Sequence, residues 1–250
     1  MCRVSDLRQA VLERNDTRAE RLRAELTARG TVVVNLLSSP GSGKTALLET
    51  ELRLARERGV TAAALTADLA TENDARRLAR SGVPVKQVLT DGLCHLEADM
   101  LAGHLTGWLP EATRLLLFVE NVGNLVCPAS YDLGESLRVV LASVTEGEDK
   151  PLKYPTAFGL AQLVVVTKQD LAQAAGFDRE AFLANVRQVN PGVEVVDTSV
   201  RDGLNPGVLL ERALAVGAGA PAHRPVMARP AGHSHGGPHT HDGPHSHVGG

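Results

Sequence analysis

The stretch SSPGSGKT, Ser38–Thr45, decides how the rest of the sequence is read. It follows the apolar run TVVVNLL (31–37) and opens a helical pattern, TALLETELRLARER. A strand, a glycine-rich turn and a helix in this order are typical of a phosphate-binding loop. Gly41 and Gly43 allow consecutive backbone N–H groups to point at an anion. The stretch therefore predicts a nucleotide site, although Ser38 stands where the motif G-x-x-x-x-G-K-[ST] has its first glycine.

The motif also assigns roles to side chains. Lys44 would contact the β- and γ-phosphates, and the Thr45 hydroxyl would bind Mg²⁺. The residues expected to contact the nucleotide here are Ser39, Gly41, Ser42, Gly43, Lys44, Thr45 and Ala46.

Composition narrows the class of protein. The 250 residues are 43% apolar but only 3% aromatic, which favours an aliphatic α/β core. A formal charge of −3 argues against a broad nucleic-acid surface. Neither a membrane span nor a signal peptide is expected, because no apolar run approaches about 20 residues and the N-terminus is charged. Three cysteines indicate no disulfide framework, so a reducing, cytoplasmic location is expected.

Hydrophobic patterning predicts a three-layer P-loop NTPase fold of the α/β class, with a mostly parallel sheet. The expected domain covers 31–216, after an N-terminal helical segment (1–30) in which an amphipathic helix spans 5–29. A flexible linker (217–232) and a histidine-rich tail (233–250) follow it. Strands are expected at 31–37, 60–67, 83–89, 114–120, 137–144, 162–167 and 193–198, and a last helix at 204–216.

Two acidic residues follow buried strands, where ligand sites of parallel sheets lie. Asp68 ends the second strand, and we expect it at the Mg²⁺ site rather than as a turn aspartate, since Thr71 or Asn73 could cap the next helix. Glu120 begins ENVG, which resembles the D-x-x-G element of nucleotide hydrolases with Glu in place of Asp. The Gly123 amide would then reach the γ-phosphate. With Lys44 and Thr45, these residues form the predicted catalytic group.

The base is expected at the end of the 162–167 strand, which delivers TKQD, Thr167–Asp170. In GTPases the corresponding N-K-x-D reads guanine. Asp170 would accept hydrogen bonds from the base, and the stem of Lys168 would lie over it. Because Thr167 replaces Asn, the motif supports guanine without settling the choice. Ser199 and Val200 fall where a second base-contacting loop is expected.

Three residues suggest a transition-metal site in the domain. Cys94 and His95 are adjacent near an expected helix N-terminus, which should lower the pKa of the thiol and favour the metal-binding thiolate. Cys127 follows Gly123 by four residues. A ligand there would lie on a loop that senses the nucleotide. Each cysteine alone would more often be a small buried hydrophobe.

The tail is a six-residue repeat, HSHGGP, HTHDGP and HSHVGG. Alternating imidazoles suit Ni²⁺, Zn²⁺ or Cu²⁺ and should release them as the pH falls through about 6.5. Interruption by Pro, Ser, Thr and Asp does not look like a purification tag. The expected ligands are His233, His235, His239, His241, His245 and His247.

Together these residues resemble the HypB family of hydrogenase maturation factors, the nickel-incorporation GTPases. The resemblance covers about 31–216 and rests on NLLSSPGSGKT, ADLATENDA, CHLEA, ENVGNLVCP, SVTEGEDKPLKYP and TKQD, in that order. ENVGNLVCP and EGEDKPLKYP are the most specific of these, because generic GTPases have no use for them.

The resemblance implies slow hydrolysis of GTP to GDP with Mg²⁺, and a homodimer when GTP is bound. It also implies delivery of Ni²⁺ to the large subunit of [NiFe] hydrogenase with a partner nickel metallochaperone, and no nucleic-acid or membrane partner. The site for Ni²⁺ or Zn²⁺ would be Cys94, His95 and Cys127, near the dimer interface.

Two departures and three rival readings remain. A C-x-x-C-G-C nickel motif found at some N-termini is absent, since only Cys2 lies there, so no such site is expected. Histidine-rich segments in the family are usually N-terminal, whereas this one is C-terminal. The rivals are a nickel or zinc storage protein acting through its tail, a urease-type accessory GTPase, whose C-P-H motif is absent, and an ATP-dependent kinase.

Overall fold

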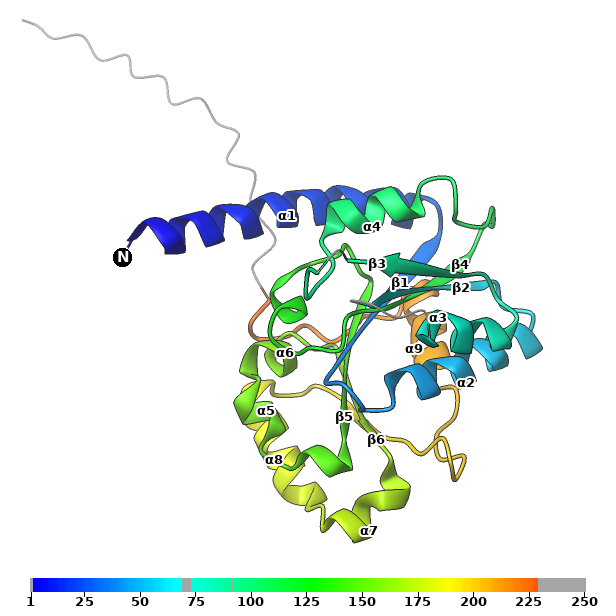
Figure 1. The fold of residues 1–250 in the computed structure, drawn as a ribbon. Coiled ribbons are helices and arrows are strands. Elements are labelled where there is room, and N and C mark those ends of the chain that lie inside the picture. Colours follow the sequence, from blue (N-terminus) through cyan, green and yellow to red (C-terminus); the bar gives the residue numbers. More distant parts are fainter. Residues whose placement is uncertain (1, 69–72, 91, 229–250) are drawn as a thin grey trace, which may run out of the picture.

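The computed structural model describes residues 2–68, 73–90 and 92–228. Seven parallel strands form one sheet in the order β3-β2-β4-β1-β5-β6-β7, with helices on both faces (Figure 1). The strands are β1 (Thr31–Ser38), β2 (Ala62–Asp68), β3 (Val85–Leu89), β4 (Leu115–Glu120), β5 (Leu137–Ser143), β6 (Leu163–Thr167) and β7 (Val195–Asp197). The predicted α/β class and parallel sheet are confirmed.

Five helices lie near expected positions, whereas no helix was expected at α5 to α8. They are α1 (Cys2–Ala28), α2 (Lys44–Glu57), α3 (Asn73–Leu78), α4 (Ala98–Leu105), α5 (Lys150–Lys153), α6 (Pro155–Gly159), α7 (Ala172–Ala175), α8 (Arg179–Val189) and α9 (Val208–Gly217). Short 3-10 turns lie between them, of which η2 (Pro128–Ser130) matters most for the site.

Alternate residues of β1 point to opposite faces of the sheet, and all eight are buried. Val34 and its neighbours meet Leu48 and Leu52 of α2 and Leu209 of α9 on one face. Val33 meets α1 and α4 on the other. The central strand is thus covered on both sides, as parallel sheets require.

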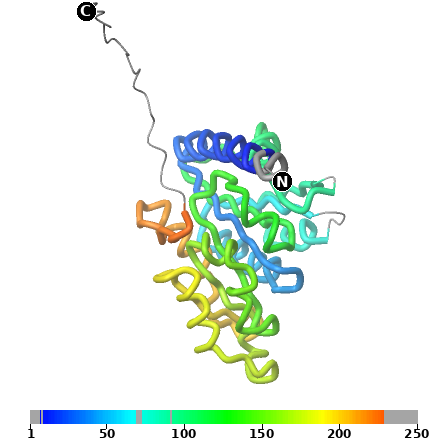
Figure 2. The backbone as a smooth tube through the Cα atoms, turned by 90° about the vertical axis from the view of Figure 1, so that its left-hand side faces the viewer, coloured from blue at the N-terminus to red at the C-terminus, as the bar shows by residue number. Residues whose placement is uncertain are grey.

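Helix α1 is half packed and half exposed. Leu22 and Leu26 are buried against the sheet, whereas Leu7 is 68% and Val11 48% exposed. Figures 1 and 2 both show α1 lying beside α4. Leu22 and Leu26 therefore join the core, whereas Leu7 and Val11 do not.

The last helix begins later than expected, at Val208 rather than Leu204. Glu51 of α2 is fully buried and accepts hydrogen bonds from the backbone N–H groups of Gly207 (3.0 Å) and Leu210 (2.9 Å). Its carboxylate therefore satisfies the free amides at the helix start. Burial raises the pKa of Glu51 to about 7, although these hydrogen bonds oppose the rise. Leu204, the expected first residue of the helix, instead ends a turn of residues 199–204 that is closed by a bridge between Ser199 and Leu204.

Part of the segment expected to be a flexible linker (217–232) lies against the domain. His223 Nε2 is 2.8 Å from Asn190 Oδ1, and Ala222 packs on the core. Pro225 is buried as well. Glycine and proline content therefore did not reveal that this part of the segment packs on the domain, because its contacts come from α6, α8 and neighbouring loops.

Candidate nucleotide and metal sites

The phosphate-binding loop has the backbone that its glycines predict. Gly41 has φ 74° and Gly43 has φ 92°, in the left-handed region that favours glycine. Gly43 directly precedes α2, so the N-terminus of that helix faces the phosphate position. The loop lines an open cavity of about 540 Å³, here called the nucleotide cavity. The expected contacts Ser39, Gly41, Ser42, Gly43, Lys44, Thr45 and Ala46 all line it.

Two features of this cavity fit a phosphate group. Ser42 Oγ is buried and has no hydrogen-bond partner among the described residues. Lys44 is buried at the cavity wall, where its ammonium donates to the Asn121 carbonyl and lies 3.7 Å from Glu120 Oε1. A buried cation beside an anion-binding turn is the arrangement that phosphate oxygens need.

Glu120 and Asp68 offer the hard oxygen ligands that Mg²⁺ prefers. Thr45 Oγ1 donates to Glu120 Oε1 at 2.6 Å, so the hydroxyl and the carboxylate lie together. Asp68 ends β2 and lines the same cavity, as does Gly123. Burial raises the pKa of Glu120 and lowers that of Lys44, while each opposes the shift of the other.

Two charged cavity residues were not assigned to the site from sequence. Asp74 and Arg77, both on α3, line the nucleotide cavity, and Arg77 Nε donates to Glu49 at 2.7 Å. Their i, i+3 spacing just after Asp68 would place both on one helix face. That spacing was the signal that could have identified them. Thr71, a candidate cap for this helix, lies outside the described residues.

The TKQD segment lies against the phosphate loop. Thr167 Oγ1 donates to the Ser42 carbonyl at 2.5 Å, and Lys168 Nζ donates to the Gly41 carbonyl at 2.6 Å. Thr167 thus supports the loop in place of the Asn of the usual motif. Asp170 Oδ1 accepts a hydrogen bond from Ser199 Oγ at 2.8 Å. Val200 is half exposed beside it.

The Cys–His region, defined as Cys94, His95 and Cys127, lies between two loops. Cys94 Sγ is 3.8 Å from His95 Nδ1. Tyr131 stacks on the His95 ring with centroids 3.9 Å apart and an angle of 25° between the planes. His95 Nε2 lies 3.5 Å from Glu97 Oε1. Cys94 and Cys127 are both free thiols.

The expectation of a lowered thiol pKa is wrong. The pKa of Cys94 is raised, because its side chain hydrogen bonds to Cys127 and desolvation adds to the effect. Helix α4 begins only at Ala98, so Cys94 lies too far before it to gain from the helix dipole, which acts within the first turn. Any thiolate here must be stabilised by another charge.

Across the described ranges, no three or more His, Cys, Asp or Glu side chains are grouped so as to hold a metal ion. Cys94, His95 and Cys127 are neighbours, and their role as ligands stays a prediction. The tail histidines lie outside the described residues, and so does that part of the prediction. No helix in 2–68, 73–90 or 92–228 has the length and hydrophobicity to cross a bilayer.

Comparison with known proteins identifies the domain. Residues 32–197 match the family described as CobW/HypB/UreG, nucleotide-binding domain. The hydrogenase maturation factor HypB of Escherichia coli strain K12 is 50% identical over 194 residues, which are 77% of this chain and 66% of that protein. The HypB of Azotobacter vinelandii is 46% identical over 205 residues, 82% of this chain and 67% of that protein. The match thus spans about two thirds of the length of these relatives.

Solved structures agree with the fold. The HypB structure from Archaeoglobus fulgidus has a TM-score of 0.75 at 35% identity and covers 82% of this chain and 100% of its own. The structure of HypB from Helicobacter pylori in complex with nickel has a TM-score of 0.71 at 36% identity, and the match covers 81% of this chain and 93% of that chain. On this evidence the chain belongs to the HypB family of hydrogenase maturation factors.

Proposed function

We propose that this chain is a GTP-hydrolysing nickel carrier that delivers Ni²⁺ during maturation of [NiFe] hydrogenase. One observation carries the proposal. The end of β4 and the loop after it line the nucleotide cavity at Glu120 and Gly123, and the loop then brings Cys127 beside Cys94. The eight residues 120–127 therefore reach both sites, so a change at the phosphates has a short route to the metal ligands.

The residues divide the hydrolysis between them. Lys44 and the backbone N–H groups around Gly43 would hold and neutralise the phosphates, and the Gly123 amide would contact the terminal one. Thr45, Asp68 and Glu120 would hold Mg²⁺, which supplies further charge neutralisation. Asp170 and Lys168 would select guanine. No side chain stands out as a general base, so the chemistry relies on positioning and charge.

The Cys–His region would hold the cargo. Thiolate and imidazole suit Ni²⁺ and Zn²⁺ alike, so the donors alone do not choose the metal. We propose that GTP binding favours a homodimer in which this region becomes a complete site. Hydrolysis would reverse that change, with a coupling free energy of about 1–3 kcal/mol. A partner metallochaperone and the hydrogenase large subunit would supply and receive the metal.

A nickel titration tests the proposal. We would use the full-length chain with its six tail histidines replaced by glutamine, once with GDP and once with a non-hydrolysable GTP analogue. A tight site that is lost in Cys127→Ala, and whose affinity or stoichiometry differs between nucleotides, is expected. Cys2→Ala is the matched control and should bind as the parent does.

Other outcomes would change the proposal in defined ways. Equal nickel binding in both nucleotide states would mean that the nucleotide governs docking to partners rather than the metal affinity. If no tight site exists once the tail histidines are replaced, storage by the tail becomes the better function. Similar affinity for ATP and GTP would contradict the role given to Asp170.

A further inference from the structure

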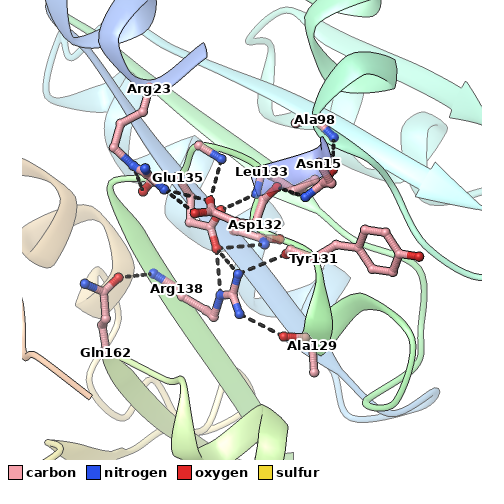
Figure 3. Close-up of polar contacts among 12 residues, drawn as sticks. Asn15, Arg23, Ala98, Ala129, Tyr131, Asp132, Leu133, Glu135, Arg138 and Gln162 are labelled. Carbon is pink, nitrogen blue, oxygen red and sulfur yellow. Dashed lines mark hydrogen bonds and ion pairs between the residues drawn. The ribbon is translucent and has the colours of Figure 1, made fainter. Parts of the chain in front are cut away.

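A buried ion pair lies directly behind the loop that carries Cys127. Arg138, the second residue of β5, donates from Nε to Glu135 Oε1 at 2.6 Å, and its Nη2 is also 2.6 Å from that oxygen (Figure 3). Both side chains are more than nine-tenths buried. Burial favours the neutral acid, but the Arg138 charge together with hydrogen bonds to the carboxylate, including the one from the Leu133 amide, outweighs it and lowers the pKa of Glu135 to about 2. The pair is therefore fully charged at neutral pH.

The guanidinium of Arg138 also donates hydrogen bonds to the loop that carries Cys127. Arg138 Nη1 donates to the Ala129 carbonyl at 2.9 Å, and Nη2 donates to the Tyr131 carbonyl at 3.0 Å. Both carbonyls belong to the turn η2 and the residue that ends it, immediately after Cys127. One planar group thus fixes two alternate carbonyls of the turn, while Glu135 fixes the plane of that group.

The same turn contributes the ring that covers His95. Tyr131 provides one of the two carbonyls held by Arg138, and its side chain stacks on His95. Two residues before Ala129, Cys127 contacts Cys94. The hydrogen bonds of Arg138 therefore go to the segment that places Cys127 and orients His95 rather than to the candidate ligands themselves.

Helix α1 holds this assembly from the other side. Asn15 Nδ2 donates to the Asp132 carbonyl at 2.8 Å, and Asn15 Oδ1 accepts from the Ala98 amide at 2.9 Å. Arg23 pairs with both carboxylate oxygens of Asp132 at 2.6 and 2.7 Å. The loop after Cys127 and the segment after His95 are thus joined by one asparagine, as Figure 3 shows.

We propose that Arg138 is a positioning residue for nickel binding by the Cys–His region, acting through the Ala129 and Tyr131 carbonyls. The proposal rests on the function proposed above. A buried ion pair is weak evidence for stability, because apolar residues of similar volume often replace one without loss. Four directed contacts from one guanidinium instead fix the backbone geometry of the loop, which is what a ligand site on that loop requires. Lysine cannot reproduce that planar fork.

The test uses the full-length chain with the tail histidines replaced by glutamine. Nickel affinity is measured by competition with a chelator, thiolate ligation by the sulfur-to-nickel charge-transfer band, and nucleotide affinity by titration with GDP. We expect Arg138→Lys to weaken nickel binding about 10- to 100-fold and to weaken the band. GDP affinity should stay within about twofold. Arg53→Lys, in an exposed ion pair with Glu57, is the matched control and should change neither.

A second pair of variants protects the test against misfolding of the first. Tyr131→Ala removes the ring from His95 without touching the buried ion pair, whereas Tyr131→Phe keeps it. We expect about tenfold weaker nickel binding for Tyr131→Ala and recovery in Tyr131→Phe. If Arg138→Lys does not fold, this pair decides the matter.

Three results would overturn the inference. The first is a nickel affinity equal to that of the parent in both Arg138→Lys and Tyr131→Ala. The second applies if Arg138→Lys does not fold, and is a nickel affinity of Tyr131→Ala equal to that of the parent. Equal losses of nickel and GDP affinity in Arg138→Lys would show a merely structural role. Cys127→Ala separates these failures from that of the proposed function. If it keeps the nickel affinity and the band intensity of the parent, the function itself is wrong; if both fall while the other variants keep them, only the role of Arg138 is wrong.

Discussion

The nucleotide cavity and the Cys–His region are built in opposite ways. The cavity is shaped mostly by one continuous segment, in which Gly41 and Gly43 set the backbone and the start of α2 completes the anion site. The Cys–His region takes its residues from two loops and its support from α1 and β5. The first geometry is therefore encoded locally, whereas the second depends on residues more than a hundred positions apart.

The two regions meet in the core at Asn35 of β1. Its amide donates to Glu135 Oε1 at 3.4 Å and accepts from the Asn121 amide at 3.4 Å. The Asn121 carbonyl in turn accepts from Lys44. Contacts thus run without a break from Lys44 at the nucleotide cavity to the ion pair behind the Cys127 loop. The contrast between the two regions would fail if a substitution in one region also impaired the function of the other.

Lys44→Ala should have the largest effect. Removing the charge that faces the phosphates should lower the rate of GTP hydrolysis about 10²- to 10³-fold in single-turnover assays. Nickel affinity with GDP bound should stay near the parent value, because the Cys–His region does not use this side chain. The control is Lys153→Ala, in an exposed ion pair with Asp149. Equal losses of hydrolysis and nickel binding would contradict the separation of the two regions.

Glu51, on the helix α2 that follows the phosphate-binding loop, should make the free energy of unfolding depend on pH. Its pKa of about 7 when folded exceeds its ordinary value of 4.5, so the folded state holds its proton more tightly. The stabilisation, on the order of 3 kcal/mol, is complete below about pH 4.5 and is lost as pH rises through about 7.

Urea unfolding of Glu51→Gln at pH 5 and pH 8 checks this. The free energy of unfolding of the parent should fall more between these pH values than that of the variant. Glu57→Gln, on the same helix but in an exposed pair, should behave as the parent. A variant with the full slope of the parent would assign the pH dependence to other groups.

Asp170→Asn should weaken GTP binding about 10- to 100-fold, because a charged acceptor for the base is lost. The amide would offer a donor to the carbonyl that xanthine carries at C2, so affinity for xanthosine triphosphate should rise. Nickel affinity should not change. Asp149→Asn is the surface control. Unchanged GTP affinity in the variant would mean that the TKQD segment only supports the phosphate loop.

Ser199→Ala should have the smallest effect, a loss of about 2- to 10-fold in GTP affinity. Ser199 orients Asp170 through one hydrogen bond. The loss should therefore vanish when Asp170 is already Asn, as a double-mutant cycle would measure. Additive losses would give Ser199 a separate contact with the base.

The parts of the fold and site that could be predicted from the sequence share a physical feature. Each strand was recognised because a parallel sheet buried on both faces needs continuous aliphatic residues, as in LLLFV of β4. Asp68 and Glu120 were expected at strand ends on one edge of the sheet, and both end strands and line the nucleotide cavity. The errors arose where a partner distant in the sequence overrides local pattern. Glu51 moved the start of α9, and Cys127 reversed the expected pKa shift of Cys94.

The sequence by itself determined the phosphate loop, the order of the strands along the chain and the family resemblance, since all three depend on neighbouring residues and their backbone preferences. Only the tertiary structure decided which buried charges support the two regions. Arg138 reads in sequence as an ordinary strand residue, and Asn15 as a polar position on a charged helix. Their roles exist because folding brings α1, β5 and the Cys127 loop together, where buried polar groups must find partners.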